Sequence, residues 1–162
     1  MSHFLRTFSL AALSFCIVLL FGCSTVVDPS VAEKEVRQKT DELVEAWRLN
    51  DQDWFERNTV NEYLITAQIL EVVSKEQVVE YMSGVEDDPD PGTAKIDDWQ
   101  TVVDGNVVVS LYELTWTFDS GRLNEVRVTD VWSRYESQWK LLSQHVSRIS
   151  LSDPTDSGTA EE

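Results

Sequence analysis

The amino-acid sequence predicts one α+β domain, in which N-terminal helices pack on the concave face of a curved antiparallel sheet and make it cone-shaped. Three observations support this prediction. Apolar residues recur at helical spacing in the first third of the chain. From Ile96 onward the pattern is that of β-strands separated by turn residues. The stretch from Val126 to Ile149 reads as two long strands joined at a polar break, Glu136-Ser137.

The N-terminus has the pattern of a secretory signal. Positive charge in Met1–Arg6 precedes an apolar run from Leu10 to Phe21 that is too short for a comfortable membrane span. The run ends in Leu20-Phe21-Gly22-Cys23, which resembles the bacterial lipobox. The resemblance implies a lipoprotein signal peptide at residues 1–22, an acylated Cys23 and a tether at 23–30. The alternative is an uncleaved anchor helix.

Lipid anchoring through Cys23 implies a place in the bacterial cell envelope. Ser24 follows the cysteine, where an inner-membrane retention signal has Asp, and this favours the periplasmic side of the outer membrane. The chain carries a formal net charge of −16, and loss of Arg6 with the signal makes it more negative. Such acidity excludes nucleic-acid binding through phosphates. It also repels anionic lipid headgroups, so attachment to the membrane has to depend on the acyl chains.

Cleavage before Cys23 leaves one cysteine and one histidine, His145, in the mature chain. No disulfide can form within one mature chain, and a zinc site of His and Cys ligands is not available. The sequence therefore predicts no metal and no cofactor, and stability has to come from an apolar core.

The helices are expected in the first half of the domain, which spans residues 31–151. Ser30 and Glu33 form a predicted capping box, and one apolar stripe follows: Val36, Thr40, Leu43, Val44 and Trp47. Residues 51–57 predict a short helix with Trp54 and Phe55 turned inward. Another helix is expected from Ser74, capped by Gln77, to Gly84.

The strands are expected between and after these helices. Residues 63–73 predict one or two short strands, and residues 96–103 and 107–118 predict a hairpin around Asp104-Gly105. The hairpin of residues 126–149 completes a four-strand meander. Residues 152–162 are acidic and poor in apolar residues, so a disordered tail is expected there.

A two-residue turn at Glu136-Ser137 sets the register of the last hairpin. Trp132 would face Leu141, Asp130 would face Ser143 and Val128 would face His145. Because side chains alternate along a strand, one face would carry a mostly apolar set: Val126, Val128, Asp130, Trp132, Trp139, Leu141, His145 and Ile149. The apolar members, Val126, Val128, Trp132, Trp139 and Leu141, are the predicted pocket lining.

Asp130 and His145 are the predicted polar pair of this pocket. A carboxylate beside an imidazole can fix the ring tautomer and raise the imidazole pKa, so the pair could abstract a proton or orient a ligand. The alternative is a structural hydrogen bond or an ion pair with a nearby arginine. Glu113 would join the pocket if Asp119 faces Arg122. A loop one residue different in length would place Tyr112 there instead.

Three segments of the last hairpin carry a family resemblance: Val128-Thr129-Asp130-Val131-Trp132, Trp139-Lys140-Leu141-Leu142 and His145-Val146-Ser147-Arg148. They resemble the closing hairpin of the nuclear transport factor 2-like superfamily, especially its SnoaL-like branch, with Glu136-Ser137 where Asp-Gly is usual. The superfamily includes ketosteroid isomerase, scytalone dehydratase and polyketide cyclases together with non-catalytic binding domains. The resemblance therefore implies the fold and leaves the activity open.

Two functions are consistent with these observations. The first is a non-catalytic pocket domain for a small apolar or amphipathic ligand or a protein partner. The second is a cyclase, isomerase or lyase with His145 as base, Asp130 as its orienter and Glu113 or Tyr112 as proton donor. Residues 107–118 are apolar on both faces, so we also expect a homodimer, which is common in the superfamily.

Overall fold

A computed structural model describes residues 27–67, 70–84 and 92–150. The predicted signal peptide, Cys23 and the predicted tail lie outside these residues. The described residues form three helices: α1 (Pro29–Leu49), α2 (Gln52–Asn58) and α3 (Lys75–Gly84). The same part of the chain contains six strands: β1 (Thr59–Ala67), β2 (Leu70–Ser74), β3 (Thr93–Asp104), β4 (Val107–Thr117), β5 (Leu123–Tyr135) and β6 (Gln138–Ser150). No helix within the described ranges is long and apolar enough to cross a membrane.

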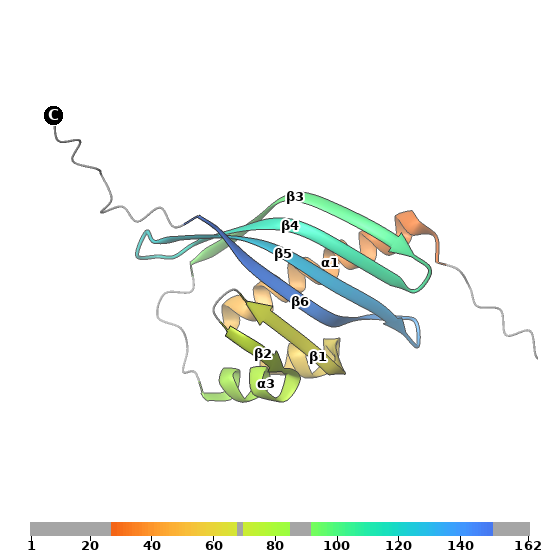
Figure 1. Cartoon of the computed structure of the whole chain (residues 1–162), viewed down its shortest axis with the longest axis horizontal. Helices are drawn as coiled ribbons and strands as arrows, with labels where there is room; N and C mark the ends of the chain where they lie inside the picture. The colour runs from red at the N-terminus through yellow and green to blue at the C-terminus, as the bar shows by residue number, and fades with distance from the viewer. Residues whose placement is uncertain (1–26, 68–69, 85–91, 151–162) are drawn as a thin grey trace, which may run out of the picture.

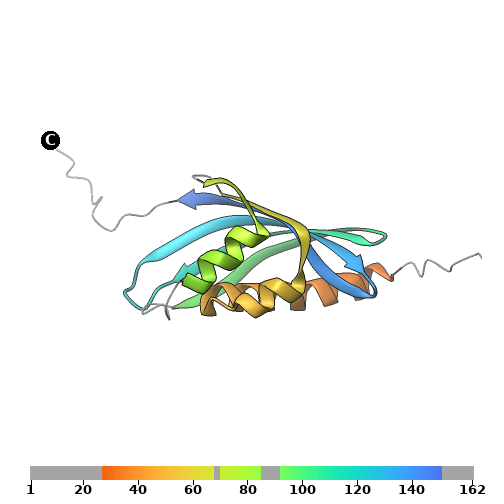
Figure 2. The same ribbon diagram turned by 90° about the horizontal axis from the view of Figure 1, so that it is seen from below.

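The strands form one mixed sheet in the order β2-β1-β6-β5-β4-β3. The predicted antiparallel meander, β3 to β6, is confirmed, but β1 adds to β6 in parallel, which was not predicted. The helices lie on one side of the sheet, and the sheet bends around them (Figures 1 and 2). The α+β prediction is therefore confirmed. We call the two sides the helix-covered face and the outer face.

Local sequence signals explain the helix positions. The predicted stripe of α1 faces the sheet, and Val36, Thr40 and Leu43 are fully buried. The predicted box at Ser74 is confirmed: Ser74 N donates to Gln77 Oε1 (2.9 Å), and Gln77 N donates to Ser74 Oγ (3.4 Å). The Ser30 box is wrong, because the N-cap of α1 lies two residues earlier, at Asp28, and the helix begins at Pro29.

The last hairpin turns at Glu136 and Ser137, as predicted. Both residues have positive φ, 47° and 72°, the geometry of a type I′ turn, whose twist matches that of the flanking strands. Trp132 faces Leu141, also as predicted.

Beyond that point the predicted register is wrong, because β6 contains a bulge. Trp132 faces Leu141 while the preceding residue, Val131, faces Ser143, so Leu142 is an extra residue. Asp130 consequently faces Gln144, and Val128 faces Val146 rather than His145. Since side chains alternate with a period of two, the bulge moves His145 to the outer face.

The β4–β5 connection also differs from the first prediction. Thr117 faces Leu123 across a loop of residues 118–122, so Asp119 and Arg122 are not paired in the ladder. Glu113 therefore faces Arg127, and Tyr112 faces Val128. Tyr112 thus takes the place on the helix-covered face that Glu113 would have had, as the alternative loop length predicts.

Candidate functional site

A row of polar residues crosses the helix-covered face of the sheet. Cross-strand pairing joins Thr101 to Ser110, Ser110 to Asp130, and Asp130 to Gln144. Ser110 and Asp130 are fully buried, and Gln144 is nearly so. Polar groups in such a position require hydrogen-bond partners, and burying them lowers the stability of the fold. The row therefore marks a candidate functional site.

Asp130 is at the centre of this row and has two hydrogen-bond donors. Tyr112 Oη donates to Asp130 Oδ2, and Gln144 Nε2 donates to Asp130 Oδ1, both at 2.9 Å. Burial, which disfavours the charged carboxylate, raises the pKa of Asp130 to about 7, although both hydrogen bonds act in the opposite direction. The carboxyl group can therefore gain or lose a proton near neutral pH.

Two tyrosines complete the surroundings of Asp130. Burial, with the negative charge of Asp130 as the next cause, raises the pKa of Tyr63 and of Tyr112 far above the ordinary value. Both phenols are therefore neutral hydrogen-bond donors at physiological pH.

Three buried polar atoms in the same region have no hydrogen-bond partner among the described residues: Tyr63 Oη, Ser110 Oγ and Trp132 Nε1. Ser110 pairs with Asp130 across the strands, and Trp132 follows Asp130 by two residues on the same face. Such unpartnered atoms are uncommon in folded proteins. Here they are available to a bound molecule or to buried water.

The outer face holds the two other predicted site residues. His145 is exposed, and its Nδ1 lies 2.7 Å from Thr66 Oγ1. Glu113 forms an ion pair with Arg127. The prediction that Asp130 and His145 share one face is therefore wrong, and the bulge at Leu142 is the physical reason. Glu113 is likewise separated from Asp130 by the sheet.

The predicted pocket residues do lie on the helix-covered face, but they are packed. Trp132 and Leu141 are fully buried, Val128 and Trp139 are 1% and 3% exposed, and Val126 is 8% exposed. Trp132, Trp139 and Leu141 belong to the main core under the helices, whereas Val126 and Val128 pack with Tyr112 in a second cluster. In this structure they form core, not an open cavity.

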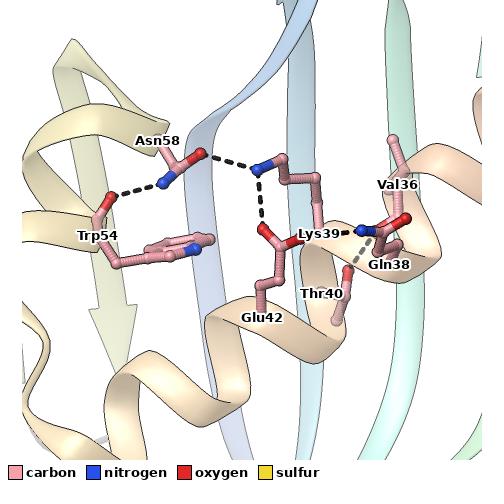
Figure 3. Close-up of polar contacts among 7 residues, drawn as sticks. All are labelled: Val36, Gln38, Lys39, Thr40, Glu42, Trp54 and Asn58. Atoms are coloured by element: carbon pink, nitrogen blue, oxygen red, sulfur yellow. Dashed lines mark hydrogen bonds and ion pairs between the residues drawn. The ribbon is translucent and has the colours of Figure 1, made fainter.

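An open hollow of about 550 Å³ lies beside Trp139, between α1, α2 and the β5–β6 turn. Lys39 Nζ bridges Glu42 Oε2 (2.8 Å) and Asn58 Oδ1 (3.0 Å), and Asn58 Nδ2 donates to the Trp54 carbonyl oxygen (2.9 Å) (Figure 3). Trp139 Nε1 donates to Glu35 Oε2. Because these groups already bond one another, we assign them to fixing α1 against α2.

Sequence reasoning identified Asp130 and, as an alternative, Tyr112. It missed Gln144, Ser110 and Tyr63, because their place beside Asp130 depends on strand pairing that the sequence does not specify. No cluster of three or more potential His, Cys, Asp or Glu ligands occurs within the described ranges.

No family model and no curated protein matches the chain. Solved structures do. An NTF2-like protein from Cytophaga hutchinsonii has a TM-score of 0.63 and 16% identity, covering 76% of this chain and 100% of its own. A Parabacteroides distasonis protein provisionally named a ketosteroid isomerase has a TM-score of 0.55 and 22% identity, covering 65% and 81%. The association domain of C. elegans CaMKII has a TM-score of 0.61 and 13% identity, covering 73% and 96%.

These similarities show that the chain has the nuclear transport factor 2-like fold, as the last hairpin indicated. At such identities they show the fold alone, and function has to come from the site.

Proposed function

We propose that this domain is a non-catalytic binding module for a small apolar or amphipathic molecule, held on the helix-covered face of the sheet. The supporting observation is the set of unpartnered polar atoms, Tyr63 Oη, Ser110 Oγ and Trp132 Nε1, around the buried Asp130 carboxyl. Ligand sites commonly combine apolar walls with a few placed polar groups. The walls here are the packed aromatic and aliphatic side chains beside Asp130, so a ligand has to displace them as it enters.

The arrangement favours binding over acid–base catalysis. The predicted catalytic base, His145, and the predicted acid, Glu113, are both on the outer face. In the part of the chain that the structure describes, Asp130 has hydrogen bonds with Tyr112 and Gln144 and none with an imidazole or a second carboxylate. A carboxyl group with a pKa near 7 suits a general acid or base, so turnover is the other outcome of the test.

A thermal-shift screen tests the proposal. The chain from Ser24 onward contains every described helix and strand, and lipids, steroids and polyketide-like acids are the probes. A compound that binds the folded state will raise the melting temperature. Tyr112→Phe should reduce the shift, whereas His145→Gln, on the opposite face, should leave it unchanged.

Chemical analysis of each hit after long incubation separates binding from catalysis. Recovery of an unchanged compound supports the binding module. Chemical conversion of the compound by the wild type but not by Asp130→Asn would show that the domain is an enzyme and would refute the binding module. Equal melting-temperature shifts in Tyr112→Phe and in the wild type would show that the ligand binds elsewhere on the protein.

We further propose that Cys23 is acylated and tethers the domain at the outer membrane of a bacterial envelope. The Leu20-Phe21-Gly22-Cys23 ending after a short apolar run supports this. Cys23→Ala should leave an unprocessed precursor or release a soluble domain, as seen by fractionation and gel migration. Wild-type migration and fractionation of this variant would contradict lipidation.

We also propose that the outer face packs against a second copy of the chain. Two neighbouring rows on this face, Val102–Val109–Val131 and Gln100–Leu111–Thr129, contain no charged side chain, and Val102 is 66% exposed. Copies with a net charge of −16 repel each other, so these two uncharged rows are where they can approach. The whole outer face of β3 to β6, charged rows included, has an area of about 750 Å², given four strands about 4.8 Å apart and about 12 residues long. That is close to the ~800 Å² per partner of a stable interface.

Sedimentation tests the dimer with two variants of identical chemistry. Leu111→Glu puts a charge into the middle of the outer face and should produce a monomer. Leu49→Glu puts the same charge at the exposed end of α1 and should leave the dimer intact. A wild type that sediments as a monomer at micromolar concentration would refute the proposal.

A further inference from the structure

A hollow of about 610 Å³ lies where α1 passes the start of β3. Figures 1 and 2 show these two elements side by side, and α1 packs on β3 more than on any other strand. The lining comes from one stretch of α1, between Arg37 and Arg48, and from residues Gly92–Ile96. The hollow is separate from the one at the α1–α2 junction.

This hollow is much richer in cations than the rest of the chain. Its lining has three cations, Arg37, Arg48 and Lys95, and two carboxylates, Asp41 and Glu45. The whole chain has 13 basic and 29 acidic residues. With Asp97, the partner of Lys95, the three cations are balanced by three carboxylates, whereas the chain as a whole is strongly acidic. Three cations gathered in so acidic a protein make this the place where an anion is repelled least.

Each cation has a carboxylate partner at the surface. Arg37 pairs with Asp41 (3.3 Å), Arg48 with Glu45, and Lys95 with Asp97 (2.9 Å), all at least partly exposed. Single-contact exposed pairs such as Arg37–Asp41 and Lys95–Asp97 contribute little to stability, whereas Arg48 binds Glu45 through two hydrogen bonds and is held more firmly. A ligand anion can therefore recruit Arg37 and Lys95 without unfolding the helix or the strand.

A series of side-chain contacts links the hollow to the buried carboxyl group of Asp130. The Arg37 guanidinium lies 4.9 Å from the centre of the Trp99 ring. Trp99 stacks on Tyr112 with ring centres 5.7 Å apart, and Tyr112 donates to Asp130. A bulge in β3, where Asp98 has a φ of 48°, lies between Asp97 and Gln100 and contains Trp99.

We infer that the ligand is a single-chain amphipathic monoanion with a carboxylate headgroup. The carboxylate binds at Arg37, with Arg48 and Lys95 nearby, and the apolar chain lies along Trp99 toward Tyr112. A guanidinium offers paired donors that match a carboxylate. This inference rests on the proposed binding function and adds the chemical class of the ligand and its point of entry.

Calorimetric titration with decanoate and decanol, both kept as monomers in solution, tests the inference on the chain from Ser24 onward. The two probes share the apolar chain and differ in headgroup charge. Decanoate should bind roughly tenfold more tightly, as expected for a hydrogen bond to a charged group. Salt should reduce this preference, because the cations are partly exposed.

Two substitutions with the same charge change localise the effect. Arg37→Gln should remove most of the decanoate preference and leave decanol binding nearly unchanged. Arg57→Gln, at an exposed arginine of α2 outside this hollow, is the matched control and should keep the preference. Lys95→Gln is a second variant on the hollow itself, and a wild-type melting temperature shows that each variant folds.

The outcomes separate the two proposals. Equal affinity of the wild type for decanoate and decanol would overturn the carboxylate assignment and leave the binding module standing. Equal loss in the Arg37 and Arg57 variants would attribute the preference to overall charge and overturn the site. Failure of both probes to bind would count against the binding module, and the inference would fall with it.

Discussion

Raising the pH from about 4 to about 8 is expected to destabilise the protein by roughly 4 kcal/mol through Asp130 alone. Its ordinary pKa of 3.8 applies to the unfolded chain, and burial raises the pKa in the folded protein to about 7. The folded state therefore binds the proton more tightly. The stabilisation is fully present below about pH 4 and is lost as the pH rises through the folded-state pKa of about 7.

Asp130→Asn isolates this effect from the many other carboxylates, because the amide has nearly the same shape and cannot ionise. Urea unfolding of both proteins across this pH range gives the free energy of unfolding. Relative to the wild type, the free energy of unfolding of the variant should increase by roughly 4 kcal/mol from low to high pH. Parallel curves would show that the Asp130 carboxyl is not desolvated as described.

Gln144→Leu is expected to lower the free energy of unfolding by roughly 1–3 kcal/mol, because it removes one of the two donors to the buried Asp130. The loss should be larger above pH 7, where the carboxyl is charged. The neighbouring His145 is exposed and faces away, so His145→Leu should change stability by no more than about 0.5 kcal/mol.

The two substitutions introduce the same side chain at adjacent positions of β6, and denaturant unfolding compares them directly. They report which residue lies on the helix-covered face. A larger loss for His145→Leu than for Gln144→Leu would mean that β6 has no bulge at Leu142.

The sequence was sufficient for the elements whose signals are local. The apolar stripe of α1, the box between Ser74 and Gln77 and the turn at Glu136-Ser137 depend on residues a few positions apart. The pair Trp132–Leu141 follows from the turn by counting. The resemblance in the last hairpin added the fold, which the solved structures confirm.

The site could not be predicted in full, because its geometry depends on single-residue shifts. Leu142 is the bulge residue and has no partner in the β5–β6 ladder. Leucine is an ordinary strand residue, so its type does not indicate that the register shifts there. The loop after Thr117 decides in the same way whether Tyr112 or Glu113 faces the helices. Parallel pairing of β1 with β6 joins segments far apart in the chain, so Ile65 beside Gln144 has no local signal.

The central claim is that the Asp130 carboxyl is buried and bound by Tyr112 and Gln144 on the face away from His145. Carboxyl-detected NMR titration of Asp130 tests this claim most directly, and the signal is assigned by its absence in Asp130→Asn. The signal should titrate near pH 7 in the wild type. Tyr112→Phe should raise this pKa further, because the lost hydrogen bond favours the charged form, and His145→Gln should leave it in place. Titration near the ordinary value of 3.8, or a pKa that follows His145 and not Tyr112, would contradict the account.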